Sequence, residues 1–102
     1  MPTPPHDVAE AARRGLRLRE EYGRGGTEVG VARARDLSNR RNLSDETIDR
    51  MVSFFARHSV NRDREGWSRG EDGYPAASLV AWLLWGGDPG RRWALYQQSK
   101  RR

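Results

Sequence analysis

The sequence contains no cysteine, and it has no run of apolar residues that approaches the ~18 of a membrane-spanning helix. The first absence excludes disulfides and thiolate metal ligands. The second predicts no membrane partner, and the N-terminal stretch MPTPPHDVAE lacks the apolar segment of a secretory signal. No segment alternates strictly between apolar and polar residues and no repeat recurs, so helices are the only regular elements that the pattern predicts.

Groups suited to catalysis are also scarce. The chain has 2 histidines, and only His58 lies in a region expected to fold. No serine or aspartate stands at a spacing that demands a nucleophilic triad. His58 falls near the end of a predicted helix, where a boundary or capping residue is expected. The sequence therefore predicts no enzyme, no cofactor, no bound metal and no small-molecule substrate.

Positive charge is in excess, with 19 basic against 14 acidic residues and a net charge of +5. Lys100 is the only lysine, so arginine supplies nearly all of this charge. A basic balance favours polyanionic partners such as nucleic acid. A GC-rich coding sequence would also produce this bias towards arginine, and pairing of the arginines with the acidic residues would account for it equally well.

A chain of 102 residues is long enough for one domain. We predict an all-α fold, a compact bundle of about five short helices around a central apolar helix. A flexible lead of residues 1–6 precedes the single helical domain 7–98, and residues 99–102 form a basic tail. The predicted helices span about 7–22, 28–38, 45–59, 75–86 and 89–98.

The central helix is predicted in the stretch GYPAASLVAWLLWGGDPG, because residues 75–86 are apolar nearly all round. Pro75 is expected in its first turn, and Gly86 followed by Gly87 is expected to end it. The last helix should contribute Trp93, together with Tyr96 or Leu95, to the core.

Capping residues mark the other helix starts. Thr27 and Ser44 are predicted N-caps for the second and third helices. Asp7 with Glu10 fits a capping box for the first helix. Asp88 is predicted to cap the last one, with Pro89 at its first position.

Residues 61–73, NRDREGWSRGEDG, form a long polar segment without a period. Such a loop in a small domain is usually functional or mobile, and Trp67 is expected to pin it to the core. A lesser alternative is a calcium-binding loop over residues 61–72. Asp72 is shorter than the usual final glutamate, and the arginines of the loop oppose a cation. The positions that match calcium ligands or the central glycine are Asn61, Asp63, Glu65, Gly66 and Asp72.

The second and third helices resemble a helix-turn-helix in outline, so a dedicated DNA-binding module is one alternative. An ordinary helical hairpin with a solvated basic face is the other. Exposed tryptophan beside arginine would instead mark a protein interface, with Trp67 and Trp93 as candidates and core packing as their simpler role. The predicted contact residues for nucleic acid or a protein partner are Arg33, Arg40, Arg41, Arg50, Arg57, Arg69 and Trp67.

The segments VARARDLSNRRNLSDETIDRMVSFFARHSV, GEDGYP, AWLLWGGDPG and RWA together resemble a small domain of tailed-phage and prophage head-module proteins. It is similar to sequences associated with portal proteins and XkdF-like prohead proteases, over residues 10–95. The chain departs from that pattern at Asn61, where an acid is usual, and in standing free of a fused head protein. The resemblance implies a phage or prophage origin and a role in the virion or its assembly, in the host cytoplasm or the virion. Together with the scarcity of catalytic groups, it leads us to expect a non-enzymatic protein. Its implied partners are phage head proteins or nucleic acid, contacted through an arginine-rich surface.

Overall fold

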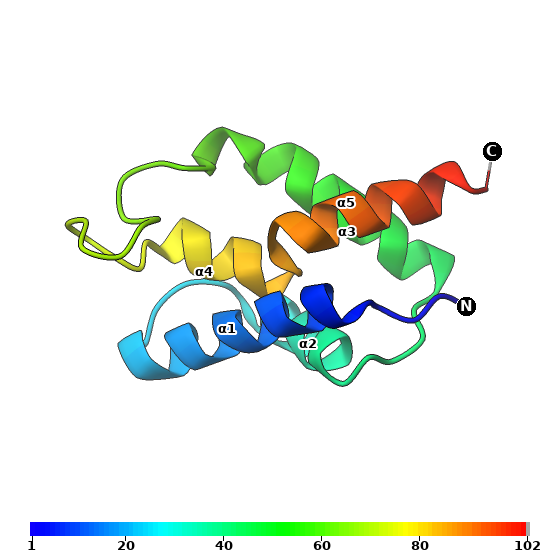
Figure 1. Ribbon diagram of the computed structural model, residues 1–102, viewed down its shortest axis with the longest axis horizontal. Helices are drawn as coiled ribbons and strands as arrows, with labels where there is room; N and C mark the ends of the chain where they lie inside the picture. The colour runs from blue at the N-terminus through cyan, green and yellow to red at the C-terminus, as the bar shows by residue number, and fades with distance from the viewer. Residues whose placement is uncertain (102) are drawn as a thin grey trace.

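The computed structural model describes residues 1–101, and within that range the fold is all-α, with five helices and no strand (Figure 1). This confirms the predicted fold class. None of the helices in the described range has the length and apolar character needed to cross a membrane. The elements are α1 (His6–Tyr22), α2 (Glu28–Ser38), α3 (Asp45–His58), the short 3₁₀ helix η1 (Ser59–Asn61), α4 (Ala77–Leu84) and α5 (Gly87–Ser99).

The helices form two pairs with α4 between them. α1 packs along α2 and α4, while α3 packs along α5. Figure 1 shows α1 and α2 on one side of the molecule and α3 and α5 on the other. α4 contacts all four other helices, which is why its sequence is apolar on nearly every side. It is the central helix that the sequence predicts.

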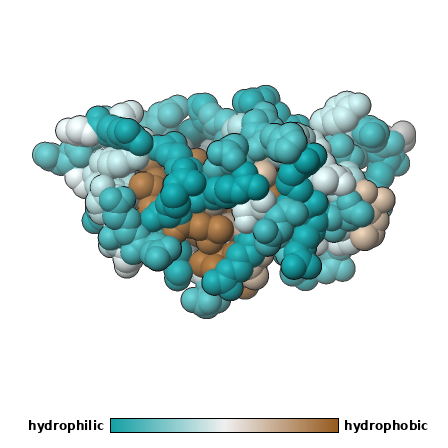
Figure 2. All heavy atoms as spheres, turned by 60° about the horizontal axis from the view of Figure 1, so that its bottom comes forward, coloured by the Kyte–Doolittle hydropathy of each residue, from teal (hydrophilic) through white to brown (hydrophobic). Residues whose placement is uncertain are grey.

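A set of touching aromatic rings from α3 and α4 fills the middle of the core. Phe54 stacks on Trp85 with ring centroids 4.7 Å apart and planes 9° apart. Phe55 meets Trp82 edge to face at 4.8 Å. Aromatic pairs of both kinds add stabilisation beyond burial of their area. Outside this core, hydrophilic side chains cover most of the face in Figure 2, with apolar surface visible in one strip.

Two of the predicted N-caps are confirmed. The Thr27 hydroxyl accepts a hydrogen bond from the amide of Gly30 at 3.1 Å, and the Ser44 hydroxyl accepts one from the amide of Thr47 at 3.2 Å. The predicted bounds of α2 therefore agree with the structure. α3 begins as predicted at Asp45 and ends one residue early.

The capping box at Asp7 is wrong. α1 begins one residue earlier, with Pro5 as its N-cap in an extended conformation. The Asp7 carboxylate accepts from the adjacent amide of Val8 at 2.8 Å, which leaves it unable to cap. Glu10, expected to reach back, pairs with Arg13 instead.

Asp88 does not cap α5 either. The helix begins at Gly87, and its N-cap is Gly86, whose φ of 112° favours glycine. The Asp88 carboxylate instead accepts a hydrogen bond from Trp82 Nε1 at 2.9 Å and pairs with Arg62. Asp88 therefore makes tertiary contacts in place of the capping contact that the local sequence predicts.

Pro75 lies outside α4 and not in its first turn. The N-cap of α4 is Ala76, whose amide donates to the carbonyl of Gly66 at 2.8 Å. This bond joins the long loop to the start of α4 and delays the helix to Ala77.

Of the large residues that α5 is predicted to bring to the core, only Trp93 packs against it. Ala94 is fully buried, and Trp93 is half-buried against the core. Tyr96 and Leu95 are 59% and 40% exposed, so the expectation that one of them enters the core is wrong. A Cβ added at Gly90 would lie 2.9 Å from the carbonyl oxygen of Trp85 and in ordinary contact, at 3.6 Å, with the Phe55 ring, so the start of α5 leaves no room for a side chain there.

Both ends of the described chain contact the domain. In the lead, the carbonyl of Pro2 accepts from the amide of Leu43 at 2.9 Å, and Pro4 is buried. In the tail, Arg101 pairs with Asp49 on α3. Residues expected as flexible extensions therefore make specific contacts.

Candidate binding groove between α2 and α3

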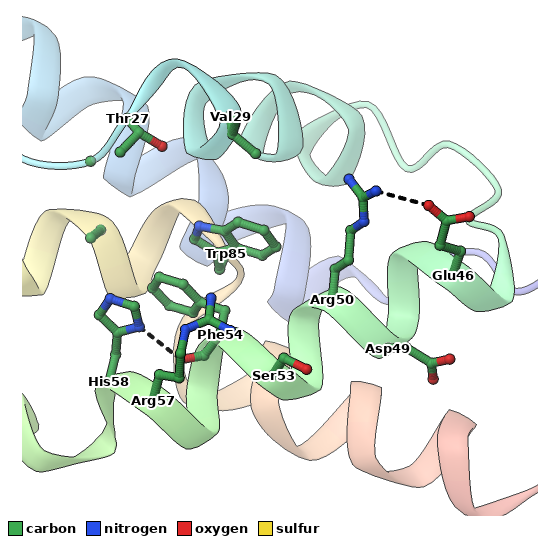
Figure 3. Close-up of a pocket in the computed structure, with 12 residues that line it drawn as sticks. Thr27, Val29, Glu46, Asp49, Arg50, Ser53, Phe54, Arg57, His58 and Trp85 are labelled. Carbon is green, nitrogen blue, oxygen red and sulfur yellow. Dashed lines mark hydrogen bonds and ion pairs between the residues drawn. The ribbon is translucent and has the colours of Figure 1, made fainter.

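An open groove of about 700 Å³ lies between the start of α2 and the exposed side of α3, with the end of α4 beneath it (Figure 3). We call it the α2/α3 groove. Its lining is mainly apolar, with charged side chains along the α3 wall. The lining residues are Gly26, Thr27, Val29, Glu46, Asp49, Arg50, Ser53, Phe54, Arg57, His58, Ala81 and Trp85.

The floor of the groove is the stacked pair Phe54 and Trp85. These residues are only 5% and 8% exposed, and one face of each ring is covered by the other. His58 stacks on Phe54 at 4.2 Å, and the guanidinium of Arg33 lies 5.7 Å from the Trp85 ring centroid. The floor is therefore rigid, apolar and closed.

Val29 forms the apolar rim on the α2 side. It is 56% exposed in the first turn of the helix, and Figure 3 shows it across the groove from α3. The buried stripe of α2 consists of Gly30, Val31, Ala34 and Leu37. Val29 lies outside that stripe, so packing of the domain gives no reason for an apolar residue there.

Some charged side chains on the α3 wall have an ion-pair partner and others do not. Arg50 pairs with Glu46 at 2.9 Å, one helical turn away. Hydrogen bonds from Arg101 and then Gln98 hold the pKa of Asp49 below its usual range. Arg57 makes no ion pair or hydrogen bond within the described residues. It is therefore the wall's uncompensated cation.

His58 is oriented by the backbone of its own helix. Its Nδ1 donates to the carbonyl of Phe54 at 2.8 Å, which leaves Nε2 as the acceptor in the neutral ring. Figure 3 shows the Ser53 hydroxyl directed away from the His58 ring. The groove thus contains a serine and a histidine that do not form a nucleophile–base pair.

α2 and α3 do not form the packed pair of a helix-turn-helix. α2 packs on α1 and α4, whereas α3 packs chiefly on α5. The two helices form opposite walls of the groove, so neither is held as a recognition helix by the other. The resemblance to a helix-turn-helix ends at the order of the elements.

Three of the predicted contact residues are engaged within the domain. The Arg33 side chain is 13% exposed and pairs with Asp36, which Arg41 also approaches at 3.8 Å. Arg40 has a φ of 51°, and its Nε donates to the carbonyl of Pro4 at 2.8 Å. Arg33 and Arg40 thus stabilise local structure, while Arg41 remains 69% exposed.

Trp67 and Arg69 lie away from the groove, in the long loop. Trp67 is half-buried, and its Nε1 donates to the Ser78 hydroxyl at 2.8 Å while its ring packs on Trp82 at 5.8 Å. Trp67 therefore joins the loop to α4, as the sequence predicts. Arg69 is exposed beside Tyr74. Of the seven predicted contact residues, the structure brings only Arg50 and Arg57 into one pocket lining.

The calcium alternative has no ligand cluster in the described part of the chain. Residues 1–101 hold no group of three or more His, Cys, Asp or Glu side chains that could bind a metal ion. Asp63 pairs with Arg62 at 2.8 Å. Glu71 folds back to accept hydrogen bonds from the amides of Gly66 and Ser68. The loop acids are thus used to shape the loop.

Sequence reasoning missed Val29 and the groove position of Trp85. The available signal was that Val29 lies out of register with the buried stripe of α2. Comparison of the chain with known protein families, with curated proteins and with solved structures finds no match.

Proposed function

We propose that this protein is a non-enzymatic binding module that holds a segment of another protein in the α2/α3 groove. One observation carries the proposal: an exposed valine and an uncompensated arginine face a closed aromatic floor from opposite walls. Concave, mostly apolar sites with a few placed polar groups are the usual form of a recognition site. Exposed apolar surface that gathers in a groove, and is not scattered singly, is typical of interaction sites.

The groove suits an apolar side chain better than a nucleobase. A base stacks on the face of an aromatic ring, but Phe54 is stacked on both Trp85 and His58, and Phe54 and Trp85 are almost fully buried. An aliphatic or aromatic side chain can instead fill the space between these residues and Val29. Its burial would contribute roughly 1.5–3 kcal/mol.

Charge selects the partner further. Arg57 is free to bind a carboxylate, and Arg50 can exchange its exposed Glu46 partner for one. Arginine binds carboxylates with two parallel hydrogen bonds. The partner segment should therefore carry a large apolar residue flanked by aspartate or glutamate.

The resemblance to phage head-module domains supplies the context for this partner. Under the proposal, the segment belongs to a head or assembly protein, such as a portal or prohead component. The chain would then act in the host cytoplasm or the virion. Co-sedimentation with purified head particles tests this context separately from the groove itself.

A displayed library of random peptides, panned on the intact protein, tests the groove. We expect enriched peptides to combine a large apolar residue with an acidic one. Val29→Asp should abolish their binding while leaving α2 intact, because an acid in the first helical turn is favourable. Val60→Asp is the matched control, since Val60 is 69% exposed and lies outside the groove lining.

A second pair of variants tests whether the charge of Arg57 contributes to peptide binding. Arg57 and Arg35 are both exposed arginines in the last turn of a helix. Arg57→Gln should weaken the enriched peptides about tenfold, the cost of one charge-assisted hydrogen-bonded contact, whereas Arg35→Gln should leave them unchanged. Peptides that bind Val29→Asp as tightly as the natural chain would refute the proposal.

A further inference from the structure

Three arginines from separate segments converge on Tyr74, at the opposite end of α4 from the groove. Arg14 on α1 donates from Nη2 to the phenolic oxygen at 3.0 Å. Arg69 of the long loop lies close enough to the same hydroxyl to lower the pKa of Tyr74. Arg24, just after α1, donates from Nη2 to the Tyr74 carbonyl at 3.3 Å.

None of these three guanidiniums is matched by a carboxylate within residues 1–101. The ion pairs of that range all involve other arginines. The nearby acid Glu71 accepts hydrogen bonds from backbone amides of its own loop. Both acceptors on Tyr74 are neutral oxygens, so none of the three guanidiniums has an ion-pair partner within the described residues.

We propose that Arg14 and Arg69 at the Tyr74 hydroxyl, together with Arg24 at the carbonyl of the same residue, form a binding site for a phosphate group. A phosphate offers several acceptor oxygens in a tetrahedral arrangement, which suits guanidiniums that come from three separate segments. A single carboxylate, planar and with two oxygens, can satisfy fewer of them. The phenolic hydroxyl can rotate to donate to the bound anion. This site does not depend on the groove, and it gives the arginine-rich surface a defined ligand chemistry.

The pKa of Tyr74 is consistent with the positive charge of the surrounding arginines. Burial on its own would raise the pKa of the phenol, but hydrogen bonds from Arg14 and Arg69 outweigh it and bring the pKa below its ordinary value. The site thus already favours a negative oxygen at its centre.

Titration of the intact protein with inorganic phosphate, followed by amide chemical shifts, tests the proposal. We expect shifts centred on residues 69–74 and on the start of the α1–α2 linker. Arg69→Gln and Arg24→Gln should each weaken binding about tenfold, and these exposed positions leave the core untouched. Arg64→Gln is the matched control, because Arg64 is an exposed loop arginine that donates to the carbonyl of Val60.

An oligonucleotide distinguishes the two sources of a phosphate group. If the site serves nucleic acid, a short single strand binds more tightly than inorganic phosphate and is weakened by Arg69→Gln but not by Arg64→Gln. If the site serves free phosphate, the strand does not compete with the ion. Either result supports the site. Phosphate binding that is absent, or that is equally strong in Arg69→Gln and Arg64→Gln, overturns it, whatever the peptides do at the groove.

Discussion

The two ends of α4 use the same amino acid in opposite ways. At its C-terminal end, the groove around Trp85 is mainly apolar, and of its two lining arginines Arg50 is matched by Glu46 while Arg57 is not. At its N-terminal end, the arginines around Tyr74 have no acidic partner in the described range. An arginine that is paired with an acid adds little net charge beside an apolar surface. An arginine without an acidic partner creates a positive potential that attracts anions.

This difference shows that composition alone does not define a basic surface. Eighteen residues of one type could have spread evenly over the domain. The fold instead places some arginines beside acidic residues and leaves others without an acidic partner. We expect recognition of a protein segment at one end and of phosphate at the other, with α4 as their common support.

The largest expected effect comes from removing the support that the two ends share. Phe55 is 1% exposed and packs edge to face on Trp82 between them. Phe55→Ala should lower the free energy of unfolding by about 3–5 kcal/mol, through lost burial and a cavity. Urea unfolding measures this loss, and Phe55→Leu should recover much of it. A loss below about 1 kcal/mol would show that the aromatic core does not couple the two ends.

The next largest effect should be on binding, because each site should lose its own ligand without affecting the other site. Val29→Asp combined with Arg57→Gln should reduce peptide binding by more than about tenfold and leave phosphate binding unchanged. Arg24→Gln combined with Arg69→Gln should give the reverse pattern. Calorimetric titration of each pair with both ligands measures it. If each pair weakens both ligands alike, the sites are one diffuse surface and the comparison fails.

A smaller effect concerns Asp88, which links the loop to the core. Hydrogen bonds from Arg62 and, after the opposing effect of burial, from Trp82 hold the pKa of Asp88 below its usual range. Its contribution to stability is therefore present above the ordinary aspartate pKa and is lost as the pH falls through the lowered value. Asp88→Asn should flatten this part of the stability profile by a few tenths of a kcal/mol, the scale of an exposed ion pair. Thermal unfolding across acidic pH checks it, and identical profiles would contradict it.

The smallest expected effect lies at Tyr74. The pKa of the Tyr74 phenol is lower in the folded protein than its ordinary value. The free energy of unfolding should therefore increase slightly as the pH rises through the folded-state pKa, and this increase is lost as the pH falls back through it. Phosphate binding should weaken over the same rise, because the phenolate competes for Arg14 and Arg69. Absorbance at alkaline pH follows the phenol, and Tyr74→Phe should remove the early-titrating component. Binding that stays constant across that range would separate Tyr74 from the phosphate site.

The elements with local signals could be predicted from the sequence. Thr27 and Ser44 cap helices through their own next turn, so the starts of α2 and α3 follow from short-range chemistry. Asp7 and Asp88 have the same residue type as good caps, but a preceding proline and a distant tryptophan and arginine decide their contacts. Local pattern carries no information about such partners.

The candidate sites could be predicted only in part. The sequence predicts Arg57 and Arg69 as contact residues, but it does not predict which residues lie beside them. The groove exists because α2 and α3 are held apart by other helices, and that spacing is a tertiary property. Likewise, Arg14 and Tyr74 are 60 positions apart in the chain, so no window of sequence relates them.

The indole of Trp85 makes the groove visible to optical spectroscopy. It is the one tryptophan among the groove-lining residues, so it borders the space that an occupant would fill. Its emission should therefore move to shorter wavelength, and become harder to quench with acrylamide, when an apolar side chain displaces water from the floor. Replacing Trp67 and Trp93 with phenylalanine would reduce the background from half-buried indoles. The domain thus contains a built-in reporter, and occupancy can be followed without attaching a dye.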